Sequence, residues 1–153
     1  MQGEVFSIEG KVRAIGRDHI TGEIVSDTGW SKNLIMFGTN TGKDLILDRL
    51  GGDNTYTLNI TSLGIGTGNT TPAIGDTTLT TPVAVATSPV VFRVSNVLSF
   101  QFFFADANLG NGTYKEVGTF VDGTQMFNHA LFGTPYVKTA GVDTTIQVDF
   151  TLV

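Results

Sequence analysis

The stretch Leu98-Ser99-Phe100-Gln101-Phe102-Phe103-Phe104 decides the fold class of this chain. Side chains of an extended strand alternate between two faces, so every second residue from Leu98 to Phe104 lines the same face. Phenylalanine favours strands, and burying one ring contributes about 2–3 kcal/mol to stability. The stretch therefore predicts a central β-strand whose phenylalanine face forms the densest part of the core.

Two further segments indicate antiparallel strands. Apolar and polar residues alternate through the segment 145–152, which predicts a half-buried strand. Its inward-facing residues are expected to be Ile146, Val148, Phe150 and Leu152. Asp122-Gly123 separates the apolar runs 117–121 and 125–132, and this dipeptide between such runs is typical of a tight hairpin. Phe127, in the second run, is expected to join the same core as the phenylalanines of 98–104.

The chain has 153 residues, the length of one domain, of which 15% are charged and 19 are glycine. Strand-like runs, the first at 5–8, do not alternate with helix-like runs, which favours antiparallel sheets. The sequence predicts a single all-β domain over 1–153, an antiparallel β-sandwich or jelly-roll-like fold. Residues 66–78 are rich in glycine and threonine and predict a long polar loop.

One short helix is predicted at about residues 41–50. Thr41 is a suitable N-cap residue, Asp44 places an acid in the first turn, and Gly51 follows the last apolar residue. The leucines and Ile46 of this segment leave little polar surface, so we expect the helix to pack across the end of a sheet.

Composition and charge exclude several classes of partner and chemistry. The net charge is −5 and lysine and arginine form no cluster, which argues against nucleic-acid binding. Neither a secretory signal nor an apolar run of membrane-spanning length occurs, so we expect a soluble intracellular protein without a membrane partner. The chain has no cysteine, which excludes disulfides and thiolate chemistry.

Asp27-Thr28-Gly29 is the triplet found in aspartic proteases, whose chemistry needs two carboxylates that share a proton. The retroviral-type enzymes have an apolar residue before the triplet and a small one after it, but here Ser26 precedes and Trp30 follows. A turn after a strand explains the triplet better, because aspartate and glycine both favour turns. We therefore expect Asp27 to be structural and the protein not to be an enzyme, with no catalytic residue.

Cofactor and metal sites are only weakly indicated. Residues 64–68, Gly-Ile-Gly-Thr-Gly, resemble a phosphate-binding loop, but neither a lysine nor a helix N-terminus follows, so a glycine-rich turn is expected. His19 and His129 lack partners at ligand spacing, which argues against zinc and favours a hydrogen-bonded structural role for His129. We expect no cofactor and no metal ligands.

Two other ligand types have some support from the sequence. Calcium has possible oxygen ligands in Asp106, Asn108, Asn111 and Asp122, although turn chemistry explains these residues equally well. A glycan has possible platforms where Trp30 lies near Lys32 and where Tyr114 precedes Lys115, although ordinary surface and core positions explain these aromatics too. Glu116 stands out because its surroundings in the sequence are nearly free of charge.

Several stretches, taken in order, resemble small accessory structural proteins of tailed-bacteriophage virions. They are Thr21 to Val25 followed by Trp30 to Ile35; Leu47 to Gly51; Ile60 to Gly68 with Thr70-Thr71-Pro72 and Asp76 to Leu79; and Lys115 to Phe120 leading to 125–132 and the closing strand. One departure is Gly118-Thr119-Phe120, where similar proteins tend to have Gly-Leu-Phe.

The resemblance implies a bacteriophage structural protein located in the virion, as a capsid decoration, head-fibre or tail/neck component. Such a protein acts through contacts with copies of itself, as a homo-oligomer in a symmetric assembly, and with other virion proteins. The low charge of the chain agrees with buried subunit interfaces. The alternative is a carbohydrate-binding or receptor-binding β-sandwich module.

The expected contact surface lies between Gly66 and Pro89. This segment has one charged residue, which favours desolvation, and its prolines restrict the backbone. The prolines also flank an apolar run, 83–85, that is typical of an edge strand able to extend a neighbouring sheet. The predicted interface residues are Thr70, Thr71, Pro72, Asp76, Pro82, Val83, Val85 and Pro89. A mobile surface loop is the alternative for this segment.

Overall fold

A computed structural model of the protein describes residues 7–153, so residues 5 and 6 of the strand predicted at 5–8 lie outside the described part. The first half of the chain contains β1 (Ile8–Asp18), β2 (Ile24–Asp27), β3 (Ser31–Ile35), the helix α1 (Gly42–Leu50), β4 (Ile60–Gly66) and β5 (Pro82–Thr87). The second half contains β6 (Val90–Val94), β7 (Val97–Phe104), the short 3-10 helix η1 (Asp106–Asn108), β8 (Gly112–Val121), β9 (Gln125–Lys138) and β10 (Val142–Leu152).

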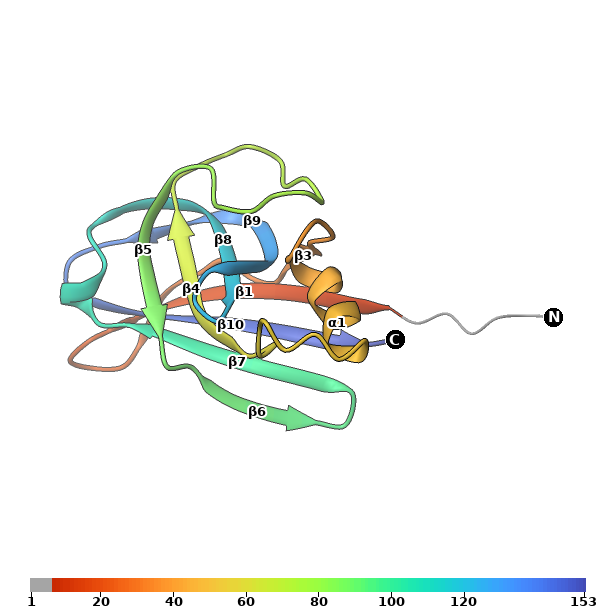
Figure 1. The fold of residues 1–153 in the computed structure, drawn as a ribbon. Coiled ribbons are helices and arrows are strands. Elements are labelled where there is room, and N and C mark those ends of the chain that lie inside the picture. The colour runs from red at the N-terminus through yellow and green to blue at the C-terminus, as the bar shows by residue number, and fades with distance from the viewer. Residues whose placement is uncertain (1–6) are drawn as a thin grey trace.

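The strands form a single curled antiparallel sheet. Their order is β5-β4-β8-β9-β3-β1-β10-β7-β6, and β2 pairs with β1. The sheet folds over at β3, whose residues 31–33 pair with β1 and whose residues 34–35 pair with β9. Two layers result, one around β8 and β9 and the other around β1, β10 and β7 (Figure 1). The predicted all-β, sandwich-like fold with one short helix is confirmed.

The two edge strands of the sheet are neighbours in the sequence. β5 pairs with β4 at one end of the strand order, and β6 pairs with β7 at the other end. Only Ser88 and Pro89 separate these strands, and Ser88 has a positive φ of 55°. The chain therefore bends at Ser88 and passes from one layer to the other, as the course of β5 and β6 in Figure 1 shows.

The core lies between the layers where the phenylalanine pattern predicts it. Phe100 and Phe102 of β7 are buried, and the rings of Phe127 and Phe150 meet edge to face with centroids 5.3 Å apart. Phe104, Ile146 and Val148 are buried as well. The prediction for the last inward residue of β10 is wrong, because Leu152 lies at the end of the sheet and is 46% exposed.

The predicted hairpin joins β8 to β9. Asp122 and Gly123 both have positive φ, 52° and 75°, which is the backbone conformation of a type I′ turn. This turn matches the twist of the two strands and fixes their register, with Val121 opposite Gln125. The pairing continues beyond the predicted runs, with Gly112 opposite Lys138 at the far end.

The helix forms where predicted, but its cap and its packing differ. The Thr41 side chain makes no hydrogen bond to the helix; its hydroxyl contacts the backbone of Gly38 instead. The Asp44 carboxylate accepts a hydrogen bond from the backbone N–H of Asn40, which fixes the residues that precede the first turn of the helix. Leu45 is buried, whereas Leu50 is 80% exposed and Leu47 is also exposed. Only one side of the helix packs on the sheet, so two of its leucines face solvent.

Candidate functional site: a tethered loop and an apolar sheet edge

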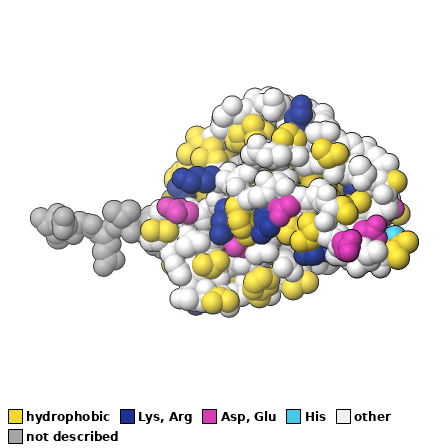
Figure 2. Space-filling model, turned by 180° about the vertical axis from the view of Figure 1, so that it is seen from behind, with side chains coloured by type: hydrophobic (Ala, Val, Ile, Leu, Met, Phe, Trp, Pro, Cys, Tyr) yellow, Lys and Arg dark blue, Asp and Glu magenta, His cyan; other side chains and the backbone are white. Residues whose placement is uncertain are grey.

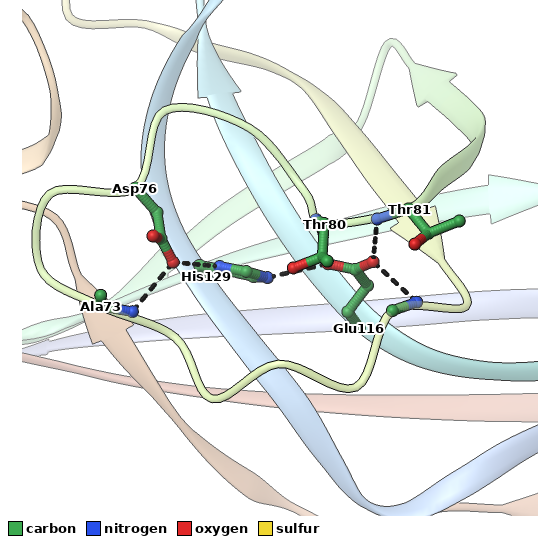
Figure 3. A network of polar contacts seen from close by, with 7 residues as sticks. Ala73, Asp76, Thr80, Thr81, Glu116 and His129 are labelled. Carbon is green, nitrogen blue, oxygen red and sulfur yellow. Dashed lines mark hydrogen bonds and ion pairs between the residues drawn. The ribbon is translucent and has the colours of Figure 1, made fainter.

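The loop that joins β4 to β5 spans residues 67–81 and carries half of the predicted interface residues. Thr70 and Thr71 are exposed, whereas Pro72 and Asp76 are half-buried. The predicted polar loop is present, and it ends three residues later than expected, because it continues to the start of β5. Its path over β8 and β9 is visible in Figure 3.

Glu116 of β8 binds both ends of this loop. Its side chain is fully buried, and its two carboxylate oxygens accept the backbone N–H groups of Gly68, Thr80 and Thr81 at 2.8, 2.7 and 2.7 Å. Hydrogen bonds from backbone amides stabilise a carboxylate, and each would be costly to lose in a buried position. A single acidic side chain therefore closes the loop at its base.

His129 of β9 links Glu116 to Asp76 at the tip of the loop. Its Nε2 lies 3.0 Å from Glu116 Oε1, and its Nδ1 lies 2.8 Å from Asp76 Oδ2. Asp76 Oδ2 also accepts the N–H of Ala73 at 2.9 Å, so the turn of the loop is held from inside (Figure 3). The expected hydrogen bonding of His129 is confirmed, with partners on two different segments.

The glycine-rich sequence at 64–68 is explained by this carboxylate. A side chain at Gly68 would overlap Glu116 Oε2, and one at Gly66 would come within 3.0 Å of the Glu116 side chain. The glycines thus allow the backbone to approach an anion, as in a phosphate-binding loop, but the anion is Glu116 of the same chain. The N–H of Gly68 is already engaged by Glu116 Oε2.

Two further contacts fix the loop to the layer below. The Phe37 N–H donates to the Ile74 carbonyl at 2.8 Å. Leu79 is buried with Met36 and Met126 in a small apolar cluster separate from the main core. With contacts at its base, tip and descending arm, the loop is an ordered part of the fold; the alternative of a mobile surface loop has no support from these contacts.

The other predicted interface residues lie on or beside the edge strand β5. The prediction that 83–85 form an edge strand is confirmed. Pro82 is exposed at its start, Val83 and Val85 are 52% and 62% exposed, and Pro89 is half-buried beyond its end. These residues do not form one cluster with Thr70 and Thr71; they continue the same surface along the sheet edge.

Sequence reasoning missed the second edge strand. All five residues of β6 are exposed, and four of them, Val90, Val91, Phe92 and Val94, are large and apolar. Such a continuous apolar run is typical of a strand buried on both faces. The signal against burial is Pro89 immediately before it, because proline is usual at the start of an edge strand.

The surface formed by the loop and both edge strands carries no free charge before Arg93. Asp76 is the one charged residue between Gly66 and Phe92. Its carboxylate points toward His129 and the Ala73 amide. The outer side of this segment is therefore formed by hydroxyl, amide and apolar groups alone.

Asp27 has the structural environment expected from its triplet. Its carboxylate binds the Arg13 guanidinium on β1 through both oxygens and accepts the Gly29 N–H at 2.8 Å. The bonds from Arg13, followed by the Gly29 amide, lower the pKa of Asp27 to about 2. Arg13 is thus the partner of this carboxylate, and the group fixes the turn that follows β2.

The oxygen-rich residues considered for calcium do not meet at one point. Asp106 Oδ1 lies 2.6 Å from the Lys138 ammonium, and Asn111 Oδ1 lies 3.5 Å from the same nitrogen. Asp122 instead binds the amide of Thr57 at 2.8 Å. The Lys138 bond lowers the pKa of Asp106. Within residues 7–153, no group of three or more His, Asp or Glu side chains is placed to hold a metal ion.

The two aromatic residues considered for glycan binding differ in accessibility. Tyr114 is buried, and its hydroxyl donates to the Gly110 carbonyl, so a platform at Tyr114 and Lys115 is excluded. Trp30 is partly exposed, but Lys11 Nζ lies 4.3 Å from its ring centroid and the Arg13 guanidinium 5.9 Å from it. These cations already occupy positions that favour contact with the aromatic ring.

Comparison of the chain with protein-family models, with curated proteins and with solved structures finds no match. In the described residues no helix has the length and apolar character needed to cross a lipid bilayer. The resemblance to virion proteins and the expected partners stay predictions.

Proposed function

We propose that this protein is a structural subunit of a bacteriophage virion, as a capsid decoration, head-fibre or tail/neck component. It acts through protein–protein contacts with copies of itself and with other virion proteins. The observation that carries the proposal is the surface formed by the tethered loop and by the edge strands β5 and β6, on which Arg93 is the one free charge within the described residues.

The edge strands favour association for two reasons. A strand at the edge of a sheet has unpaired N–H and C=O groups that can pair with a strand of another chain. Natural proteins usually protect such edges with charges, but β5 has none and β6 has only Arg93. Val83, Val85, Val90 and Phe92 would then lose exposed apolar area on pairing, at about 25 cal/mol per Å².

The tethered loop contributes a preformed surface beside β5. Ordering a flexible loop on binding costs conformational entropy, and a loop already fixed by Glu116 and His129 avoids most of this cost. Thr70 and Thr71 present hydroxyl groups on its outer side. Rigid display of an uncharged surface suits a subunit that makes the same contact many times in a symmetric particle.

The proposal is tested by replacing Val83 and Val85 with aspartate. We expect the double variant to fold, because both side chains are exposed, and to lose incorporation into phage particles and the self-association that depends on the edge strand β5. Gradient-purified particles probed with an antibody and light scattering of the isolated protein measure the two effects. Deleting the loop is a poorer test, because removing Asp76 leaves buried His129 without one partner.

Val137→Asp is the matched control, since Val137 lies on β9 with a similar exposed fraction of 50%. We expect this variant to enter particles like the parent protein. Parent protein that is absent from purified particles would contradict the virion assignment. A Val83/Val85 variant that enters particles normally would instead mean that the contact surface lies elsewhere.

A further inference from the structure

A hollow with apolar walls lies beside the start of β1. The β1–β2 turn lies at the opposite end of this strand (Figure 1). It consists of two adjoining cavities of about 490 and 290 Å³ that share Ile8 and Lys43. Its exposed apolar lining is formed by Leu34, Phe37, Leu47, Leu50 and Ile74. Five large apolar side chains exposed around one hollow are typical of a binding surface.

The same hollow is positively charged. Lys11, Lys32 and Lys43 line it, which is three of the five lysines of a chain with a net charge of −5. Among residues 7–153, Glu9 is the one acidic residue in its lining. The hollow therefore suits a partner that is both apolar and acidic.

The turn between β1 and β2, together with the strand residues on either side of it (residues 18–25), is apolar and acidic and so complements the apolar, positively charged hollow. Ile20 is 86% exposed, and Ile24 and Val25 are exposed on the adjoining strand. Asp18 and Glu23 flank the turn, Asp143 lies across from Arg17 on β10, and His19 is exposed. The turn and the strand residues next to it thus contribute three carboxylates, Asp18, Glu23 and Asp143, and one guanidinium, Arg17. Figure 2 shows acidic side chains gathered beside a histidine at one end of the molecule.

The turn is rigid enough to act as a docking element. Asp18 Oδ1 accepts the N–H groups of Ile20 and Thr21 at 2.9 and 2.8 Å, and these bonds lower the pKa of Asp18. The Asp18 N–H donates to the Glu23 carbonyl at 2.8 Å, which closes the base of the turn. Ile20 is consequently held at the apex in a fixed conformation with negative charge on both sides.

We propose that the β1–β2 turn of one copy docks into the hollow beside the start of β1 of the next copy. Ile20 enters between the apolar side chains, and Asp18 and Glu23 face Lys32 and Lys43. The inference rests on the proposed function in that it names one contact by which the subunit associates with itself. It adds a second surface, distinct from the loop and the edge strands.

The position of the two surfaces determines the form of the assembly. β1 runs between them and has 11 residues, a length of roughly 35 Å at about 3.3 Å per residue. Because the turn and the hollow are different surfaces at opposite ends of one strand, the contact is heterologous and joins copies head to tail. Such a contact closes into a ring when its rotation allows and otherwise continues as a filament.

The test uses two variants of the full chain, Ile20→Asp/Glu23→Lys in the turn and Leu34→Asp/Lys43→Glu in the hollow. Each should weaken self-association by roughly ten- to hundredfold, because each removes an apolar contact and reverses a charge. Sedimentation velocity at several concentrations measures the effect. The association of the parent protein should also weaken as salt is raised from 50 to about 500 mM, because the charges lie at an exposed rim.

Mixing the two variants gives the decisive result. Each variant retains the surface that the other lacks, so an equimolar mixture should form 1:1 heterodimers and stop at that size. A contact between identical surfaces would give no rescue on mixing and would overturn the proposal. Turn variants that associate like the parent would also overturn it, since the hollow would then be covered by another segment, such as the N-terminus of the same chain.

This experiment separates the inference from the proposed function. Parent protein that is found in particles but is monomeric at all concentrations refutes the head-to-tail contact and leaves the virion role intact. Parent protein that associates through turn and hollow but is absent from particles refutes the virion role alone. The exposed Val137→Asp variant, which alters neither surface, should associate like the parent.

Discussion

Glu116 and His129 face each other diagonally across the β8–β9 ladder, with Oε1 and Nε2 3.0 Å apart and both side chains buried. The other ring nitrogen of His129 faces Asp76, so each nitrogen has a carboxylate oxygen as its neighbour. The relationship links the sheet to the loop through one continuous network of buried polar contacts.

Replacing Glu116 should therefore destabilise the protein strongly. Glu116→Ala leaves three backbone N–H groups and one ring nitrogen of His129 without their acceptor. We expect a loss of about 3–5 kcal/mol in the free energy of unfolding, because each buried donor left without an acceptor costs about 1–3 kcal/mol. Urea denaturation followed by circular dichroism measures this loss. Exposed Glu23→Ala is the control and should change stability by less than about 0.5 kcal/mol.

Two glycines of the same loop should respond differently to alanine. At Gly68 the added Cβ would overlap Glu116 Oε2 and come within 2.6 Å of Thr80 Cβ, whereas at Gly75 it would meet nothing within 4 Å. We expect Gly68→Ala to cost about 1–3 kcal/mol, because a packed site resists added volume. Gly75→Ala should be neutral or slightly stabilising. Equal unfolding midpoints in urea for the two variants would contradict this account of the glycine-rich segment.

Adjacent phenylalanines of β7 provide a test of the core. Phe102 is fully buried, and Phe103 on the opposite face is 57% exposed. Phe102→Ala should lower the free energy of unfolding by about 3–5 kcal/mol, whereas Phe103→Ala should lower it by less than about 1 kcal/mol. Thermal or urea unfolding of both variants measures the difference. A Phe102 variant with nearly parental stability would mean that the inward face of β7 is assigned wrongly.

The elements that the sequence predicts well are those with a local signal. Alternation at 98–104 and 145–152 identifies two core strands, and Asp122-Gly123 identifies the hairpin, because each pattern depends on residues a few positions apart. The exposure of Leu47 and Leu50 had no such signal. Whether a helix packs with one side or more depends on the elements around it, which lie far away in the sequence.

The site shows the same distinction. Pro82 and Pro89 correctly bracket an edge strand, since proline acts on its own backbone. The hydrogen bond between Glu116 and Gly68 joins residues 48 positions apart, and the contact between His129 and Asp76 joins residues 53 positions apart. Neither follows from a local sequence pattern. An isolated acid in an uncharged, apolar surrounding was the available clue, because such a group is buried only when it has partners.

The last prediction concerns the pH dependence that Asp27 contributes. Its pKa is lowered to about 2 in the folded protein by Arg13 and the Gly29 amide, whereas an unfolded aspartate titrates near 3.9. A lowered pKa means that the ionised group stabilises the fold above pH 4, and that this contribution disappears as the pH falls toward 2. Both side chains of the pair are about one third exposed, so solvent screening limits the effect to about 1 kcal/mol or less.

Asp27→Asn isolates this contribution from that of the other carboxylates. The variant should be less stable than the parent at pH 7, and the two unfolding free energies should converge between pH 4 and pH 2 as Asp27 of the parent becomes protonated. Urea denaturation of both proteins across this range measures the difference, in which effects common to both, such as the lowered pKa of Asp106, cancel. A difference that stays constant down to pH 2 would show that the introduced amide disturbs the turn by its shape and that the Arg13 ion pair contributes nothing measurable.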